Sequence, residues 1–328
     1  MKLPVSARYI PLFATALVLI GLYTLGCVSF NNFGSLRVLV NLFGDNAFLG
    51  VAAVGATFVI LSGGIDLSVG SVVAFTSIFI AALVQKGVNP QVAIALALVA
   101  GAGFGTMMGL LIRMFQLPPF LVTLAGMFLA RGLGFVVAPQ SIGITHPFFL
   151  QQITEKLAIP LNDKVSIPFT ATCYVIIFLL AVVVAHYTKF GRNIYALGGD
   201  EQCATLMGLP VGRTKVLVYT LSGFCSALAG VIYTFYTQSG DPASCVGLEL
   251  DAIASVVIGG TLLSGGVGFM AGTLMGVLIL GFIQTLITFK GDLNTWWTKI
   301  VIGMLVLAFI LLQNLVTTLT SRLKAAKK

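Results

Sequence analysis

The stretch LSGGIDLSVGS, Leu61–Ser71, places three glycines and one acid inside a long apolar region. Glycine disfavours a helix interior because it exposes the backbone and loses much conformational entropy on ordering. An ionised carboxylate at the centre of a bilayer costs about 2.5–3.5 kcal/mol. Asp66 therefore needs hydrogen-bond donors nearby, and the stretch predicts a turn of the backbone within a membrane.

The composition is that of a membrane protein. Of the 328 residues, 58% are hydrophobic and 9% are charged, whereas a soluble domain carries about 25% charged residues. Residues 9–36 and 165–188 contain no charged side chain, and each run exceeds the roughly 20 residues of a transmembrane helix. The runs are continuously apolar rather than alternating, which favours helices over a β-barrel. We therefore expect an all-α polytopic fold.

Hydrophobic runs predict about ten transmembrane helices, which makes an even number of crossings and puts both termini on one side. The expected ranges are 9–29, 46–62, 71–85, 91–112, 120–138, 166–187, 214–237, 251–264, 267–289 and 299–320. With the termini inside, inner segments carry eleven basic residues (Lys2, Arg8, Arg113, Lys189, Arg192, Arg213, Lys215, Arg322, Lys324, Lys327, Lys328) and outer segments carry six (Arg37, Lys86, Lys156, Lys164, Lys290, Lys299). The positive-inside rule therefore predicts that both termini are cytoplasmic.

Two regions have too few residues for ordinary loops. Residues 46–85 and 251–289 must each supply two crossings within 40 and 39 residues. The turns between those crossings, which contain Gly63, Gly64, Gly70, Gly265 and Gly266, must therefore lie at or near membrane depth. Irregular backbone is tolerated there only when it is buried in protein or lines a wet cavity.

The sequence also repeats itself at these turns. LSGGI at 61–65 recurs as LSGGV at 263–267, and IDLSVGSVV from Ile65 resembles LDAIASVV from Leu250, which aligns Asp66 with Asp251. Paired glycine-interrupted segments are typical of a transporter pathway, and the second pairing would make an inverted repeat. Chance recurrence of short Gly, Ser and Leu strings is the alternative.

Three polar residues of the first turn, Asp66, Ser68 and Ser71, are candidates for a site beside the pathway. Asp66-Leu67-Ser68 is also typical of a helix N-cap, so we expect Asp66 to organise the turn rather than to bind substrate. Arg131 lies within a span. It either faces the pathway and hydrogen-bonds substrate hydroxyls, or extends to the outer interface.

Two further groups of residues are candidates at the membrane surfaces. Glu249 and Asp251 would open a helix from the outer side, where acids suit the helix dipole; their functional role would be an outer gate or a docking site. On the inner side, residues 200–207 predict a short helix that ends at Gly208 and Pro210. An exposed short helix of this kind could be bound by a cytoplasmic partner.

Several classes of protein are excluded or disfavoured. The chain has no Gly-Lys dipeptide and hence no Walker A loop. Its five cysteines form no C-x-x-C and its two histidines no H-E-x-x-H, so we expect no metal site, cofactor or enzyme active site. The net charge of +8 fits basic residues flanking membrane spans, and we expect lipid rather than nucleic acid around the chain.

Three motifs carry a resemblance to a known family. ILSGGIDLSVGS, LAGMFLARG and LELDAIASVVIGGTLLSGGVG resemble the ribose-type permeases of bacterial ABC sugar importers. Within that family, DNAFLGVAAVGATFVILSGGIDLSVGS and WWTKI are most similar to the permease subunits of galactofuranose importers. The resemblance implies one permease domain over 1–328, in the bacterial inner membrane, that moves a monosaccharide from periplasm to cytoplasm by alternating access.

The resemblance also implies partners. These are a second, similar permease, a cytoplasmic ABC ATPase that hydrolyses ATP, and a periplasmic sugar-binding protein. Residues 188–213 would be the cytoplasmic coupling loop, because Gln202-Cys203-Ala204 with Gly208 resembles the E-A-A-x-x-x-G coupling motif, with Gln202 replacing the acid and Cys203 one alanine. The coupling residues implied are Asp200, Glu201, Gln202, Cys203, Ala204, Met207 and Gly208.

Two other classes remain as alternatives at this point. An ion-coupled secondary sugar transporter would work without an ATPase, but such proteins usually carry more intramembrane acids. A purely structural scaffold gives no reason for the glycine turns. The residues leave open ribose, xylose and galactopyranose as substrates, and a homodimer as the assembly.

Overall fold

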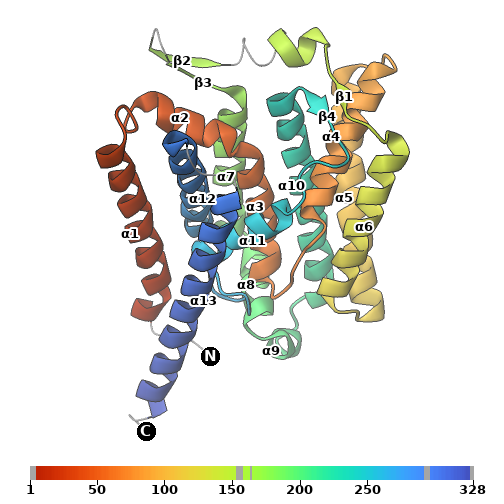
Figure 1. Cartoon of the computed structure of the whole chain (residues 1–328). Coiled ribbons are helices and arrows are strands. Elements are labelled where there is room, and N and C mark those ends of the chain that lie inside the picture. The colour runs from red at the N-terminus through yellow and green to blue at the C-terminus, as the bar shows by residue number, and fades with distance from the viewer. Residues whose placement is uncertain (1–4, 153–157, 163–164, 292–295, 326–328) are drawn as a thin grey trace.

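A computed structural model describes residues 5–152, 158–162, 165–291 and 296–325 (Figure 1). The helices within these ranges are α1 (Val5–Ser29), α2 (Leu36–Asp45), α3 (Ala47–Leu61), α4 (Val69–Gln85), α5 (Pro90–Phe115), α6 (Pro119–Val137), α7 (Phe169–Tyr187), α8 (Lys189–Gly199), α9 (Glu201–Leu206), α10 (Val211–Thr237), α11 (Leu248–Ile258), α12 (Met270–Lys290) and α13 (Trp296–Ala325). Of the basic residues used to predict the orientation, Lys2, Lys156, Lys164, Lys327 and Lys328 lie outside the described residues.

The all-α polytopic fold is confirmed, and each of the ten expected segments contains a helix. In the described ranges, seven helices are long and apolar enough to cross a membrane, or eight if α2 and α3, which meet at 55°, form one span. The helices at the expected crossings 71–85 and 251–264 are shorter than these membrane-spanning helices. α4 has 17 residues and α11 only 11. At 1.5 Å per residue, α11 covers about 16 Å of a core about 30 Å thick.

The buried centre of the molecule is built around α3 and α10. α3 is apolar on every face and is buried at all its residues except Phe48, as expected for a helix enclosed by protein. α10 packs against α3, α4 and α5. Its contact with α5 is close because Gly223 lies directly against the backbone of Gly101 and Gly105.

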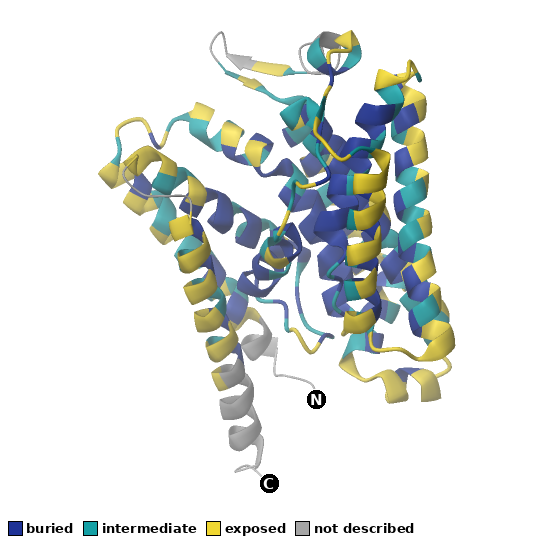
Figure 2. Cartoon of the chain, turned by 45° about the vertical axis from the view of Figure 1, so that its right-hand side comes forward, coloured by how far each residue is buried: buried dark blue, intermediate teal, exposed yellow. Residues whose placement is uncertain are grey.

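The peripheral helices are apolar on the outside instead. α1, α5, α6, α7 and α13 expose large hydrophobic side chains along their length, and Figure 2 shows exposed residues along the outer helices around a buried interior. In water such a surface would be costly. In a membrane it is the surface that contacts lipid tails, so the burial pattern agrees with a membrane-embedded chain.

The two ends of the molecule differ. α8 and α9 lie at the lower end of Figure 1, together with the start of α1 and the end of α13. The upper end carries β1 (Ile142–Gly143) paired antiparallel with β4 (Ser239–Gly240), β2 (Ile159–Asn162) paired antiparallel with β3 (Val165–Ile167), and a π-helical turn at Phe148–Gln152. The start of α1 and the end of α13 therefore lie at the same end of the molecule.

Candidate functional site

Two interrupted crossings meet inside the molecule. Residues 62–68 lead from α3 into α4, and residues 238–247 lead from α10 into α11. The first turns of α4 and α11 meet where Gly70 packs against the Cys245 carbonyl and the Glu249 carboxylate. From this point α4 continues toward the upper end of Figure 1 and α11 toward the end that carries α8. The two short helices therefore run in opposite directions.

This arrangement bears on the expected inverted repeat. The second sequence echo pairs residues 65–73 with residues 250–257. Each segment includes part of a short helix that follows non-helical backbone, and the two helices are approached from opposite ends of the molecule. The register of the echo is different, however. Asp66 precedes α4 by three residues, whereas Asp251 lies in the first turn of α11. The alignment of Asp66 with Asp251 is therefore wrong, because the two acids occupy different positions relative to the start of their helices.

Asp66 is buried, with 2% of its surface exposed. Its Oδ1 accepts hydrogen bonds from the Ser68 amide (2.9 Å) and the Ser68 hydroxyl (2.6 Å), and its Oδ2 accepts one from the Ser222 hydroxyl of α10 (2.7 Å). These donors compensate for the burial of a carboxylate. The geometry is that of a turn-forming residue, and it also attaches the start of α4 to α10.

α6 holds both segments that precede the short helices. The Thr123 hydroxyl donates to the Ile65 carbonyl (3.3 Å). Two turns further along, Nη1 of Arg131 donates to the carbonyls of Pro242 (2.7 Å) and Ser244 (2.5 Å). Arg131 therefore binds the backbone ahead of α11, which neither of its two expected roles describes.

The two LSGG turns, far apart in sequence, are in direct contact. The Gly266 amide donates to the Leu61 carbonyl (2.9 Å). A Cβ at Gly265 would lie 2.7 Å from the Gly63 amide nitrogen. Both glycines have positive φ, +84° and +82°, which L-residues rarely adopt.

A third glycine pair, at the end of α8, completes this contact. A Cβ at Gly198 would overlap the Leu61 carbonyl oxygen and lie 2.6 Å from the Gly266 amide nitrogen. The backbones of three parts of the chain are thus in mutual contact, and the space between them is too small for a side chain. We call the set of Leu61, Gly63, Gly198, Gly265 and Gly266 the glycine junction.

α9 follows the glycine junction directly and is held by its N-cap. The Asp200 carboxylate accepts from the Cys203 amide (2.9 Å), and this bond holds the pKa of Asp200 below its usual value. Ala204 is fully buried, whereas Leu206 and Met207 are 87% and 67% exposed. The expected short helix at 200–207 and its end at Gly208 (φ +75°) are confirmed; α8 was not predicted.

If the ATPase implied by the resemblance docks on α9, Asp200→Ala should reduce its recovery at least severalfold when the tagged chain is purified from native membranes. Alanine cannot accept from the free amides of the first turn of α9, so the helix would lose its defined start. Asp200→Asn is the matched control because asparagine caps helices about as well as aspartate. Equal recovery with Asp200→Ala would show that the cap is not needed.

The two acids of α11 have different surroundings. Glu249 is 9% exposed, and its Oε1 accepts from the Gly247 amide (3.2 Å) while Oε2 has no partner in the described part of the chain. Asp251 forms an ion pair with Lys299 at the start of α13 (2.6 Å). Its carboxylate lines a cavity. Ser71, by contrast, is fully buried, and its hydroxyl has no partner among the described residues.

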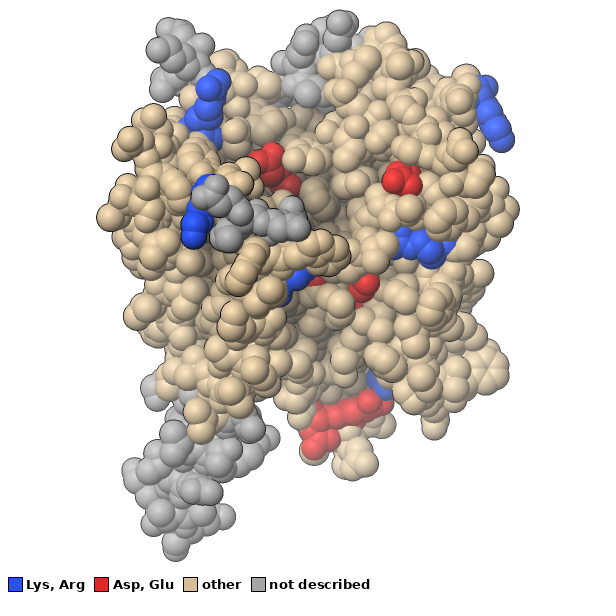
Figure 3. All heavy atoms as spheres, in the orientation of Figure 1, with Lys and Arg blue, Asp and Glu red and all other residues tan. Residues whose placement is uncertain are grey.

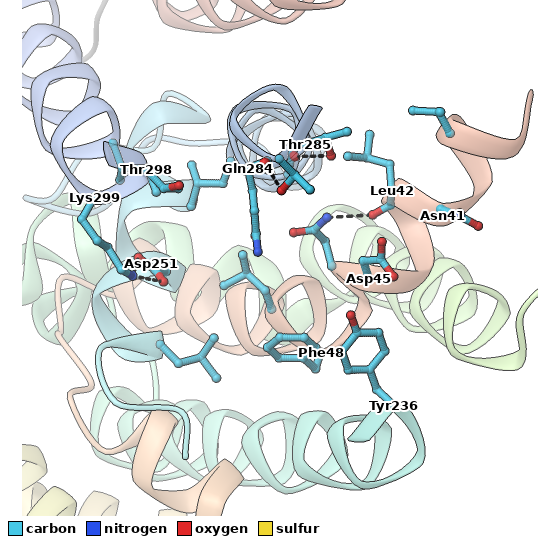
Figure 4. Close-up of a pocket in the computed structure, with 18 of the residues that line it drawn as sticks. Asn41, Leu42, Asp45, Phe48, Tyr236, Asp251, Gln284, Thr285, Thr298 and Lys299 are labelled. Carbon is cyan, nitrogen blue, oxygen red and sulfur yellow. Dashed lines mark hydrogen bonds and ion pairs between the residues drawn. The ribbon is translucent and has the colours of Figure 1, made fainter. Parts of the chain in front are cut away.

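This cavity, of about 640 Å³, lies between α2, α3, α10, α11, α12 and α13. Figure 3 shows acidic atoms beside a hollow in the upper half of this face, with other charged side chains scattered over a mostly uncharged surface. Its polar side chains come from several helices, and Figure 4 shows Asn41, Asp45, Tyr236, Gln284 and Lys299 around it. Among the expected site residues only Asp251 lines it.

Sequence reasoning therefore missed three parts of the site. Gly198 and Gly199 were visible as a Gly-Gly pair next to the expected coupling helix. Ser222, which binds Asp66, is one hydroxyl among many in a transmembrane helix. The polar residues of the cavity were signalled only by Asp45-Asn46, an acid and an amide at the edge of an apolar run.

In the described ranges no group of three or more His, Cys, Asp or Glu side chains lies close enough to hold a metal ion. What the geometry offers instead is a pair of interrupted helices, a polar cavity at one end, and an exposed short helix at the other.

Comparison with known proteins gives the family. A family model described as the permease component of a branched-chain amino acid transport system matches residues 38–310. The inner membrane ABC transporter permease protein YjfF of Escherichia coli is 48% identical over 95% of this chain and 94% of its own length. The fructose import permease protein FruG of Bifidobacterium longum is 39% identical, over 94% of this chain and 92% of its own.

A third relative is a ribose importer. The ribose import permease protein RbsC of Bacillus subtilis is 40% identical over 84% of both chains. No solved structure matches this chain. The family decides against an ion-coupled secondary transporter, because its members are permease components of ABC systems. The chain belongs to this family of ABC transporter permeases, and within it to the ribose-type sugar importers.

Proposed function

We propose that this sugar-importer permease carries galactofuranose from periplasm to cytoplasm, paired with a second, similar permease. α9 would dock on a cytoplasmic ATPase, and the upper end of Figure 1 would receive a periplasmic sugar-binding protein. Both termini would then be cytoplasmic, on the side of α8 and α9. The ribose and fructose named for the relatives are the competing sugars, and galactofuranose rests on the resemblance in residues 45–71 and 296–300.

The observation that carries this proposal is the continuity between α9 and the interrupted helices. α9 exposes Leu206 and Met207, as a docking surface requires, and follows α8, whose Gly198 contacts both LSGG turns. Those turns lie between α3 and α4 and between α11 and α12. Because this contact is made by backbone atoms, no flexible side chain lies between the segments to absorb the movement. A displacement of α9 would therefore be transmitted to these helices.

The remaining site residues take roles that follow from their contacts. Asp66, with Ser68, would hold the start of α4 in place as the helix moves, and Arg131 would do the same for the segment ahead of α11. Gly70 would let the first turn of α11 approach α4. Glu249 and Asp251 lie on that first turn, where they would form part of an outer gate.

The first experiment is purification of the tagged chain from native membranes, with its partners identified by mass spectrometry. We expect an ATP-binding cassette protein and a second permease in the eluate. Uptake of labelled galactose in cells should then be competed by methyl galactofuranoside, which is locked in the five-membered ring, and not by ribose, fructose or methyl galactopyranoside. Recovery of the chain alone, or equal competition by ribose, would contradict the assembly or the substrate, respectively.

A further inference from the structure

We propose that the cavity between α2, α3, α10, α11, α12 and α13 is a binding site for a neutral monosaccharide within this single chain. The proposal rests on the proposed sugar import, and it adds a site inside one permease subunit. Its volume of about 640 Å³ falls within the range of about 300–1,000 Å³ of small-molecule sites.

The polar groups of the cavity have free hydrogen-bonding capacity. No hydrogen bond to the side chains of Asn41, Asp45 or Gln284 is present in the described part of the chain. Two amides and a carboxylate together offer four N–H donors and several acceptor sites. The hydroxyls of a sugar both donate and accept, so this set suits a polyol.

The cavity also has an aromatic wall. The rings of Phe48 and Tyr236 lie 6.0 Å apart between centroids, and Figure 4 shows the Tyr236 hydroxyl toward Asp45. The C–H face of a sugar ring can pack on such a wall while its hydroxyls reach the opposite side, where Gln284 lies. Apolar walls with a few placed polar groups are typical of ligand sites.

The charges select against ionic ligands. Lys299 is paired with Asp251 through two contacts of 2.6 and 2.8 Å, which leaves Asp45 as an unpaired carboxylate. A sugar phosphate or sugar acid would meet that charge, and among the described residues that line the cavity the one cation, Lys299, is already paired. One carboxylate is also too few for a divalent ion, which takes six or more oxygen ligands. Anions and divalent metal ions are therefore disfavoured, and the four amide N–H donors suit the hydroxyls of a neutral sugar.

The position of these polar side chains within membrane helices also indicates a hydrated cavity. An acid, an amide and an ion pair facing lipid would be expensive, and such residues in membrane helices usually face a wet cavity or the interior of a bundle. Asp45, Gln284 and Asp251 come from three helices and converge on one cavity. Convergence of this kind indicates a hydrated site rather than a lipid-facing surface.

α11 links the cavity to the glycine junction. Asp251 lies in the first turn of α11, and the turn that follows the helix carries Gly265 and Gly266. A displacement of Gly198 would therefore reach the cavity through one short helix. The occupied cavity would open or close as α9 moves, because the cavity lies at the start of α11 and the glycine junction lies in the turn that follows α11.

The two tryptophans of the chain give a direct readout, because Trp296 and Trp297 immediately precede Thr298 and Lys299, which line the cavity. The full chain in lipid nanodiscs is titrated with galactofuranose while intrinsic fluorescence is recorded. We expect a saturable change at millimolar sugar, and at least a tenfold weaker response in Asp45→Asn and Gln284→Leu. Asp241→Asn, in a half-buried turn, and Gln91→Leu, in an exposed position, both lie outside the cavity and should respond like the unmodified chain.

Two results would overturn the site without touching the proposed function. One is a fluorescence response that sorbitol reproduces and that Asp45→Asn leaves unchanged. The other is import of galactofuranose at the unmodified rate by the assembled transporter carrying both cavity variants. If the unmodified transporter imported no sugar at all, the proposed function itself would fail, whatever the fluorescence shows.

Discussion

Asp66→Ala is expected to lower sugar uptake at least tenfold while the protein is still inserted in the membrane. The substitution removes the acceptor for Ser68 and Ser222 and leaves two buried hydroxyls without partners. Each unsatisfied buried group costs about 1–3 kcal/mol, and a change of about 1.4 kcal/mol is already tenfold in rate. The start of α4 would separate from α10. Uptake per cell, normalised to the protein in the membrane fraction, measures the effect.

Asp241→Ala is the matched control for this change. Asp241 also accepts from the amide two residues further on, Ala243 (2.8 Å), but through an exposed hydrogen bond in a half-buried turn. In the described part of the chain its carboxylate has no contact equivalent to Ser222, and Arg131 still holds the same turn through the Pro242 and Ser244 carbonyls. We therefore expect less than about a twofold loss. If Asp66→Ala transported as well as Asp241→Ala, the bond between α4 and α10 would have no role in transport.

Gly198→Ala should uncouple the ATPase from transport, whereas Gly199→Ala should not. A methyl group at Gly198 overlaps the Leu61 carbonyl oxygen, and backbone cannot move aside as a side chain can. Overpacking of this kind costs about 1–3 kcal/mol. At Gly199, the next residue in the same helix, a Cβ meets nothing within 4 Å. The pair therefore separates close packing from helix propensity, which changes equally in both variants.

The readout for this pair is uptake together with binding of the ATPase. We expect Gly198→Ala to retain the ATPase on purification, because α9 and its exposed residues are unchanged, and to lose at least tenfold in uptake, as expected for a forced rearrangement of well-packed backbone. Gly199→Ala should keep both within about twofold. Normal uptake by Gly198→Ala would show that the glycine junction can open without cost to transport.

Most of the fold could be predicted from hydrophobic runs, because each crossing helix is a long apolar segment between polar ones. The failures have local physical causes. The apolar run that suggested a helix to residue 264 continues past Gly259 and Gly260, where the backbone turns with φ of +88° at Gly260. α2 was missed because Arg37, Asn41 and Asp45 make it too polar for a membrane span.

The site could be predicted only where a local motif marks it. The cap of α9 and the turn at Asp66 are encoded within a few residues, and both were found. The glycine junction joins backbone from residues 61–63, 198 and 265–266, and no local pattern reports which glycines meet. The cavity gathers single polar residues from several helices, each of which is ordinary within its own segment.

The most direct measurement is ATP-driven sugar uptake into proteoliposomes that contain this chain, its co-purified permease and ATPase, with the binding protein added. We expect labelled galactofuranose to accumulate only when ATP is supplied on the side of the ATPase, and to fall to background when this chain is omitted. Accumulation driven by a proton gradient without ATP, or uptake that persists without this chain, would contradict its role as the sugar-conducting subunit.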